Sequence, residues 1–431
     1  MKPRRWFHAA CLTITLVVPA AAETIYSNLQ DTPIPLDFTG GTFTFAGGGS
    51  INPFFGGVGV ANNDLLQPVR TGTTNLSSLA NLVVGSTIDF DSIFSTENGG
   101  AGYGGSQTHL GTTFTDGQEG YVGFKLNDTN FGWMRVVFTA NTTGAVVRDW
   151  AYDDSGASMV VGRVQQSAVS AGTQTVTLSP GTGESFSLGS VIADSGGNIN
   201  SVLKTGAGTT TLSGVNTYTG ATIIGDGTLA LDASGSIDNT DSVSLGTGGT
   251  FDVSAKSGGY TVDVLTGSGM VIGALTVADR LAIGDSTGTI TFEDSLTLDA
   301  ASSYVYEMSG GEPPDAGFGD LGIVEGDLTL NVGTILDLVQ LGAYTAGDKF
   351  TLFDYKGTLT GTFRDVNSNN LADGATFVDG GGIWMIDYDD TLAGANGGSG
   401  FKFVTITAIP EPGVSAFIGA FGLIGLLRRR R

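Results

Sequence analysis

Two groups of neighbouring carboxylates have the spacing to do acid–base chemistry. Asp153 is followed directly by Asp154, and Asp387, Asp389 and Asp390 lie within four positions of one another. Paired carboxylates can act as the acid and the base that cleave a glycosidic bond. Both groups are also typical of solvated turns on an acidic surface, because few cationic or imidazole side chains accompany them.

Asp365, Asn367 and Asn369 follow the alternate spacing with which a Ca²⁺ loop begins. The sixth position of this loop holds Asn370 where glycine is expected, and the twelfth holds Thr376 where a bidentate Glu is expected. The pattern therefore leaves two interpretations open: a structural turn, or weak binding of Ca²⁺ by oxygen-rich turns. No other cofactor is expected.

A catalytic triad has little support, because His109 is the only histidine beyond the N-terminal segment and no Gly-x-Ser-x-Gly sequence frames a nucleophile. Aromatic residues suggest binding instead. Successive side chains of a strand point to opposite faces, so Trp133 would lie on the face opposite to that of Met134 and Val136. With Trp150 it could form a sugar-stacking platform, although an aromatic residue there can equally belong to a core.

The composition excludes several classes of function. The chain has 431 residues, of which 69 are glycine and 40% are hydrophobic, which suits many short strands joined by tight turns. Between residues 23 and 410 only 12 basic residues face 41 acidic ones, so nucleic acid is not an expected partner. The only cysteine, Cys11, lies in the N-terminal segment, so disulfides and Cys-metal sites are excluded from the rest.

The N-terminal 22 residues have the organisation of a secretory signal peptide. Lys2 and two arginines form a basic start, residues 6–18 are apolar, and Ala20 and Ala22 provide small residues before a cleavage site at Glu23. The sequence therefore predicts export, with the signal peptide at residues 1–22.

Residues 409–431 have the organisation of a second sorting signal. Pro410-Glu411-Pro412 precedes an apolar run at 413–427, and Arg428, Arg429, Arg430 and Arg431 follow it. This tripartite pattern resembles the PEP-CTERM family of exported bacterial proteins. The resemblance implies a Gram-negative-type bacterium, a short transmembrane helix at 413–427, and cleavage near the tripeptide by an exosortase-type membrane enzyme. An ordinary tail anchor is the alternative.

Residues 23–165 alternate in period two and predict an antiparallel β-sandwich. Val122, Phe124 and Leu126 would share one face of a strand. Residues 166–172 are interpreted as a linker.

Beyond the linker, glycine-led strands begin at Gly208, Gly227, Gly249, Gly269 and Gly288, which gives a period near 20 residues. This period predicts a parallel, right-handed β-helix at 173–340, followed by terminal coils and a cap at 341–408. Leu229 and Leu231 would point inward, as would Phe251 with Val253.

Residues 203–231 carry a spaced set of glycine, threonine, leucine, asparagine and tyrosine residues: Gly208, Thr211, Leu212, Gly214, Asn216, Tyr218, Gly220, Gly227, Thr228 and Leu229. The segment resembles the autotransporter-associated β-strand repeat, which implies a passenger-like β-helical stalk.

The sequence thus predicts an exported, non-enzymatic structural protein of the cell surface or extracellular matrix. The alternative is an adhesin that binds exopolysaccharide through its N-terminal sandwich. A polysaccharide-active β-helix enzyme is the third hypothesis.

Overall fold

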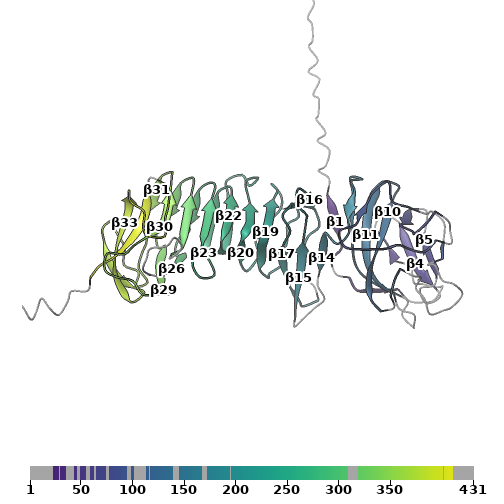
Figure 1. Cartoon of the computed structure of the whole chain (residues 1–431), viewed down its shortest axis with the longest axis horizontal. Helices are drawn as coiled ribbons and strands as arrows, with labels where there is room; N and C mark the ends of the chain where they lie inside the picture. Colours follow the sequence, from purple (N-terminus) through teal and green to yellow (C-terminus); the bar gives the residue numbers. More distant parts are fainter. Residues whose placement is uncertain are drawn as a thin grey trace, which may run out of the picture.

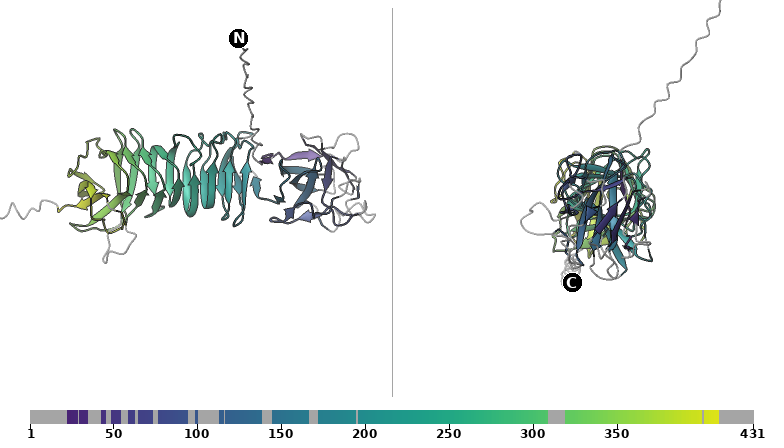
Figure 2. Two further views of the ribbon diagram at one scale, coloured as in Figure 1. Left: turned by 90° about the horizontal axis from the view of Figure 1, so that it is seen from above. Right: turned by 90° about the vertical axis from the view of Figure 1, so that its right-hand side faces the viewer.

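The protein is an elongated rod with antiparallel strands at one end, parallel coils along its length and an antiparallel cap at the other end (Figures 1 and 2). The computed structural model describes residues 23–410 except 29, 35–42, 46–48, 55–58, 63–64, 74–76, 95–98, 101–112, 116, 139–144, 167–171, 195, 309–318 and 401. Every regular element within these residues is a β-strand, so the all-β prediction is confirmed. No helix in this part of the chain has the length and apolar character needed to cross a bilayer, and the expected transmembrane segment 413–427 lies outside it.

The N-terminal part is built from antiparallel strands. One set comprises β1 (Thr24–Tyr26), β2 (Thr32–Ile34), β6 (Leu66–Pro68), β7 (Asn81–Leu82), β10 (Glu119–Leu126), β11 (Asn130–Phe138) and β12 (Ala145–Asp153). Two smaller sheets accompany it: β3 (Phe43–Thr44), β4 (Ser50–Phe54), β5 (Gly59–Asn62) and β9 (Gly99–Gly100), and the pair β8 (Thr87–Ile88) and β13 (Met159–Val160).

The two faces of β10 and β11 belong to different cores. Val122, Phe124 and Leu126 share a buried cluster with Met134 and other residues of β11, so the expected alternation is confirmed. In this cluster the Phe124 ring lies 4.8 Å from that of Phe45, which follows β3. The opposite face carries Trp133, which lies in the core that continues into the coils.

The N-terminal part and the coils share one sheet. β1 pairs antiparallel with β12 and parallel with β16 (Ser185–Leu188), so the first described strand bridges the two regions. β14 (Val164–Gln166) pairs antiparallel with β15 (Thr173–Leu178), the first strand of the coils. The sequence assigned Gln166 to a linker, but the structure places it in β14, where it is fully buried. Its side-chain amide donates to the side-chain oxygens of Gln174 and Asn200.

A buried ion pair reinforces this junction. The Arg135 guanidinium donates to Asp149 Oδ1 at 2.9 Å and to Asp149 Oδ2 at 2.8 Å. It also donates to the Gln166 carbonyl at 2.6 Å, and the Tyr26 hydroxyl donates to Asp149 Oδ2 at 2.7 Å. Asp149 is 0% exposed. The network therefore joins strands β1, β11, β12 and β14 through a carboxylate that is fully buried.

The described residues between 173 and 361 form a stack of coils with parallel pairing, the arrangement of a β-helix, and we call this region the coil stack. Its further strands are β17 (Ile199–Lys204), β18 (Thr209–Leu212), β19 (Thr222–Leu231), β20 (Val243–Asp252), β21 (Tyr260–Gly267), β22 (Gly269–Ile272), β23 (Leu275–Ile283), β24 (Thr289–Phe292), β25 (Leu296–Leu298), β26 (Ser303–Met308), β27 (Leu321–Val324), β28 (Leu328–Leu330), β29 (Ile335–Gln340), β30 (Lys349–Tyr355) and β31 (Leu359–Gly361). One ladder runs through β16, β18, β19, β20, β22, β24, β27 and β30. At about 4.8 Å per step, these strands span roughly 34 Å.

Inward side chains of successive coils form one apolar column. Leu229, Leu231, Phe251 and Val253 are all at most 1% exposed, as the alternation predicted. Glycine is needed where the chain turns closely past the preceding coil: Gly227 has φ of 66°, and a Cβ there would lie 2.4 Å from the Gly206 carbonyl oxygen.

The far end of the coil stack is closed by an antiparallel sheet. β34 (Phe403–Ala408) pairs antiparallel with β30 and with β33 (Gly382–Asp390), and β33 pairs with β32 (Thr376–Asp379). We call β32, β33 and β34 the cap sheet. Its inward residues Phe377, Trp384, Ile386 and Ile406 are at most 5% exposed and belong to the continuous core. The cap thus covers the open end of the apolar column.

Candidate functional site

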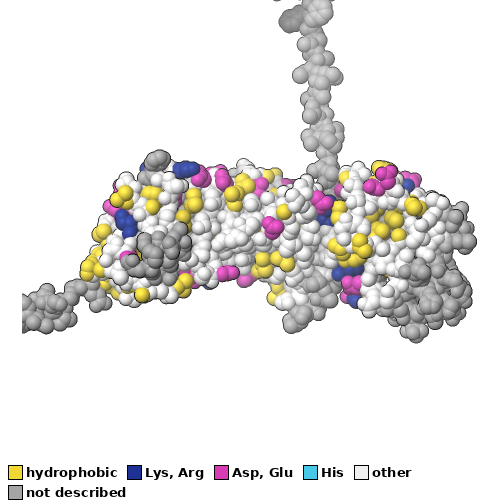
Figure 3. Space-filling model, in the orientation of Figure 1, with side chains coloured by type: hydrophobic (Ala, Val, Ile, Leu, Met, Phe, Trp, Pro, Cys, Tyr) yellow, Lys and Arg dark blue, Asp and Glu magenta, His cyan; other side chains and the backbone are white. Residues whose placement is uncertain are grey.

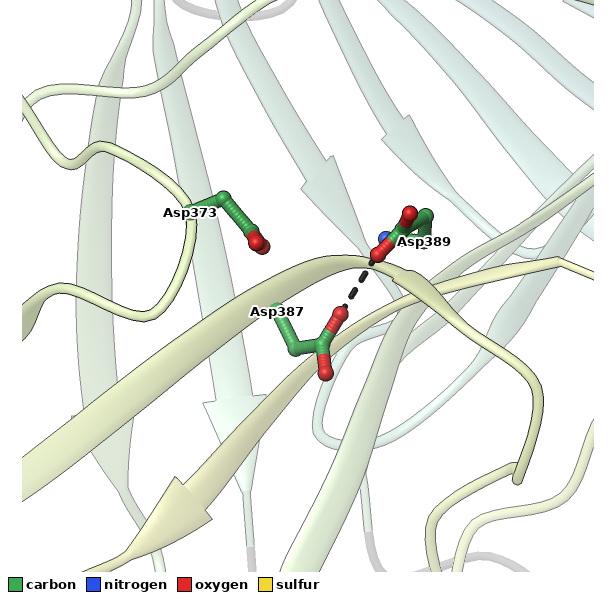
Figure 4. Close-up of side chains that lie close together, drawn as sticks. All are labelled: Asp373, Asp387 and Asp389. Carbon is green, nitrogen blue, oxygen red and sulfur yellow. Dashed lines mark hydrogen bonds between the residues drawn. The ribbon is translucent and has the colours of Figure 1, made fainter.

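Three carboxylates come together on the cap sheet. Asp387 and Asp389 lie two positions apart on β33, and Asp373 comes from the segment between β31 and β32 (Figure 4). One carboxylate oxygen from each residue lies within 4.8 Å of the others. The Asp389 N–H donates to Asp387 Oδ1 at 3.2 Å, which fixes this part of the strand.

The structure keeps the third carboxylate of the sequence group apart from this trio. Asp390 forms an ion pair with Lys349 and accepts the Thr405 hydroxyl at 2.8 Å. Although burial acts to raise it, the pKa of Asp390 is lowered, because Lys349, the Leu392 N–H and Thr405 donate to the carboxylate. Asp373 takes its place in the trio. Sequence reasoning missed Asp373, because nothing in the sequence links this loop aspartate to Asp387, which lies 14 residues further along the chain.

Among the residues that the structure describes, no Lys or Arg forms an ion pair with Asp373, Asp387 or Asp389. Burial, followed by the charges of Asp390, Asp373 and Asp389, raises the pKa of Asp387. A hollow of about 440 Å³ adjoins Asp373 and Asp389, and Lys402 is the cation on its lining. Carboxylate oxygens at this separation suit a hard cation such as Ca²⁺, of whose six to eight oxygen ligands they would supply three.

The other carboxylate pair has a structural role where the N-terminal part joins the coil stack. Asp153 is 8% exposed and accepts the Ser155 and Ala157 N–H groups at 2.9 and 3.1 Å. Asp154 accepts the Glu23 N–H at 3.0 Å. Both carboxylates therefore organise the turn after β12 and the start of β1.

The Ca²⁺-like sequence forms a closed turn. Asp365 is 5% exposed, and its Oδ1 accepts the N–H groups of Asn367 and Asn369 at 3.0 and 2.7 Å. Its Oδ2 accepts the Asn369 side-chain amide at 2.9 Å. Local donors thus occupy both carboxylate oxygens, which is the arrangement of a structural turn.

The two tryptophans do not form a common platform. Trp133 is 0% exposed and packs between Tyr26 and Tyr121, with ring centroids at 6.4 and 5.7 Å, so a sugar cannot stack on it. The same face is covered by side chains of the N-terminal part, since a Cβ on Gly123, the register partner of Trp133 on β10, would lie within 2.9 Å of Val69, Leu82 and Ile88. Trp150 is partly buried in the other cluster and stacks with Tyr152 at 5.8 Å.

Within the described part of the coil stack, the ionisable side chains of Lys204 and Asp320 are fully buried. Lys204 is 0% exposed and donates to the carbonyls of Gly206 and Asp226 at 2.7 and 2.9 Å, and burial lowers its pKa to about 8. Asp320 is also 0% exposed and accepts the N–H groups of Gly288 and Glu307 at 3.0 and 2.8 Å. Burial raises the pKa of Asp320 to about 8.

Several expected sites lie outside the described residues. They are His109, the cleavage residues Ala20 and Ala22, and the sorting residues Glu411, Pro412 and Arg428 to Arg431. Pro410 is described and exposed, directly after Ile409.

Comparison with known families finds one match. The family model described as Passenger-associated-transport-repeat matches residues 202–231. The expected autotransporter-associated β-strand repeat is therefore confirmed at these residues, and a repeat of this type suggests an exported, surface-associated protein of Gram-negative bacteria. No curated protein matches the chain.

The contacts between neighbouring coils explain why the repeat has asparagine at 216 and glycine at 220. Asn216 is 2% exposed; its side-chain amide donates to the carbonyls of Gly214 and Ser236, and its Oδ1 accepts the Ile192 N–H. It therefore ties three successive coils together. Gly220 leaves space for the preceding coil, since a Cβ would lie 2.3 Å from the Asn200 carbonyl oxygen.

Proposed function

We propose that the protein is a non-enzymatic structural protein exported to the cell surface or extracellular matrix of a Gram-negative-type bacterium. The observation that carries this proposal is the passenger-type repeat at residues 202–231, which forms part of the coil stack. Stability in such a stack grows with each added coil, so a long right-handed β-helix can serve as a stalk. The proposal includes no resident cofactor.

The proposal assigns residues 409–431 to sorting, with residues 1–22 as the signal peptide. Pro410-Glu411-Pro412 is the motif that an exosortase-type membrane enzyme would recognise, the run at 413–427 would hold the chain in the membrane before processing, and Arg428 to Arg431 would stay on the cytoplasmic side. The test is the mass of the C-terminal peptide from protein released by native cells. We expect Arg431 to be absent, and an intact Arg431 would favour an ordinary tail anchor.

We infer that Asp365, Asn367 and Asn369 form a structural turn and not a Ca²⁺ site, the first of the two interpretations that the sequence left open. Local donors occupy the Asp365 carboxylate. We therefore expect isothermal titration with millimolar Ca²⁺ to give the same heat for the wild type and for Asp365→Asn. Heat that disappears in this variant would instead place the ion there.

A glycan-binding function is the second candidate. The stacked rings of Trp150 and Tyr152, only partly buried, offer an aromatic surface of the kind that binds sugars. A glycan array with the wild type, Trp150→Ala and the control Phe90→Ala tests it, since Phe90 is an aromatic residue 71% exposed elsewhere. Binding that only Trp150→Ala abolishes would support an adhesin. Release of reducing or unsaturated ends from polysaccharide would support the enzyme hypothesis.

A further inference from the structure

The outer face of the cap sheet exposes a group of apolar side chains. Val378 is 65% exposed and lies opposite Ile383 in the pairing of β32 with β33. Met385, 38% exposed, lies two positions further along the same face of β33. The Ile409 N–H donates to the Ile383 carbonyl at 2.8 Å, which holds the chain beside them. We call Val378, Ile383, Met385 and Ile409 the outer cap face.

This face lies where the chain leaves the described structure. The opposite side of the cap sheet is core, so only this side is open to a partner. Ile409 and exposed Pro410 lead, two residues later, into the apolar run at 413–427. Apolar side chains are visible at the cap end of the rod in Figure 3. Exposed apolar side chains that cluster in this way often mark a site of contact with a protein or a membrane.

The outward side of β33 changes character along its length. Ile383 and Met385 lie at the end near the chain exit, whereas Asp387 and Asp389 follow toward the other end. At about 3.4 Å per residue, Met385 and Asp389 are roughly 14 Å apart. An apolar edge can therefore touch an interface while the acidic trio stays in water.

We propose that the outer cap face rests on the lipid bilayer in the anchored form of the protein. The inference depends on the membrane insertion of 413–427 proposed above. A tether of a few residues holds Ile409 at the membrane surface, so even a small apolar contact is favoured by the high effective concentration. The acidic trio would be repelled by anionic lipid, so the contact suits a zwitterionic surface. The rod would then project from the membrane, with its N-terminal part farthest away.

Site-specific labels in vesicles test this proposal. The full chain, with Cys11→Ser to leave no native thiol, is reconstituted in phosphatidylcholine vesicles that contain spin-labelled lipid. An environment-sensitive fluorophore is attached at Val378→Cys, at Ala420→Cys in the tail, or at Val83→Cys. Val83 is the matched control, because it is 72% exposed and lies in the N-terminal part.

We expect lipid quenching and a blue shift at Val378 and Ala420 and neither at Val83. Quenching at Ala420, with Val378 no more quenched than Val83, would overturn the cap contact while leaving the anchor intact. An unquenched Ala420 would overturn the proposed anchor and the contact with it. A blue shift at Val378 in vesicle-free protein lacking residues 411–431 would assign the face to a second copy of the chain and would also overturn the proposal.

Discussion

Replacing Asp149 by Asn should destabilise the whole rod, because it removes the anionic partner of a buried cation. Arg135 has an 8% exposed side chain and loses its bidentate carboxylate. Breaking one side of a buried pair costs about 3–5 kcal/mol. Glu119 lies 3.6 Å from Arg135, but its side chain is 46% exposed, so its compensation is about 0–1 kcal/mol. We therefore expect Asp149→Asn to lower the free energy of unfolding by about 3 kcal/mol.

The assay is urea unfolding of the processed chain, followed by tryptophan fluorescence and by far-UV circular dichroism. In a Trp384→Phe background the fluorescence comes from Trp133 and Trp150 in the N-terminal part, whereas the dichroism is dominated by the coil stack. Because one hydrophobic core runs through both regions, we expect the two transitions to coincide and to shift together.

A matched double variant separates the charge from the shape. Arg135→Met with Asp149→Leu removes both charges, so most of the loss should be recovered, leaving about 1–2 kcal/mol for the Tyr26 hydroxyl, which loses its Asp149 acceptor. A loss below about 0.5 kcal/mol for Asp149→Asn, the size of an ordinary surface change, would refute the reasoning. A shift in the fluorescence transition alone would refute the coupling of the two regions.

Three further predictions concern the coils and the cap. The raised pKa of Asp320, about 8, means that the folded state holds this proton more tightly than the unfolded chain. The contribution of Asp320 to the free energy of unfolding therefore falls as pH rises from about 4 to 8. Between pH 5 and 8, the thermal midpoint of Asp320→Asn should change less with pH than that of the wild type. Phe251→Ala should cost about 3–5 kcal/mol in urea unfolding, whereas the outward Thr250→Ala should stay within about 0.5 kcal/mol, and equal losses would contradict the inward column. Asp387→Asn should raise the thermal midpoint at pH 7 in the presence of a chelator, because it relieves like-charge repulsion, and a lowered midpoint would contradict this.

The repeat could be predicted because coil geometry imposes a period on the sequence. Gly227 pairs in register with Gly249, as the spacing of glycine-led strands indicated. The period fails where a coil changes length: Gly269 pairs with Ile290, two residues beyond Gly288. The next step of the ladder joins Thr289 to Leu321, because β25 and β26 and the following insertion enlarge that coil. The spacing of glycines indicates where the chain turns, but it does not predict the number of residues in each coil.

The candidate sites were less predictable, because they depend on which surfaces cover one another. Alternation correctly placed Trp133 on the face opposite Met134. It could not show that Val69, Leu82 and Ile88 cover that face, because those residues are distant in the sequence. The same limit hid the contribution of Asp373 to the acidic trio. Side-chain direction is a local property, whereas exposure is decided by long-range packing.

The way in which the coil stack ends limits how a scaffold of this kind can make contacts. β14 pairs antiparallel with β15 at one end, and β34 pairs antiparallel with β30 at the other. Antiparallel closure at these places occupies the strand edges that would otherwise template the addition of another chain. End-to-end growth of the parallel ladder is therefore disfavoured, and contacts must use side-chain surfaces instead. This favours a rod with distinct ends, in which the outer cap face and the N-terminal sheets can meet different partners across a spacer of roughly 34 Å.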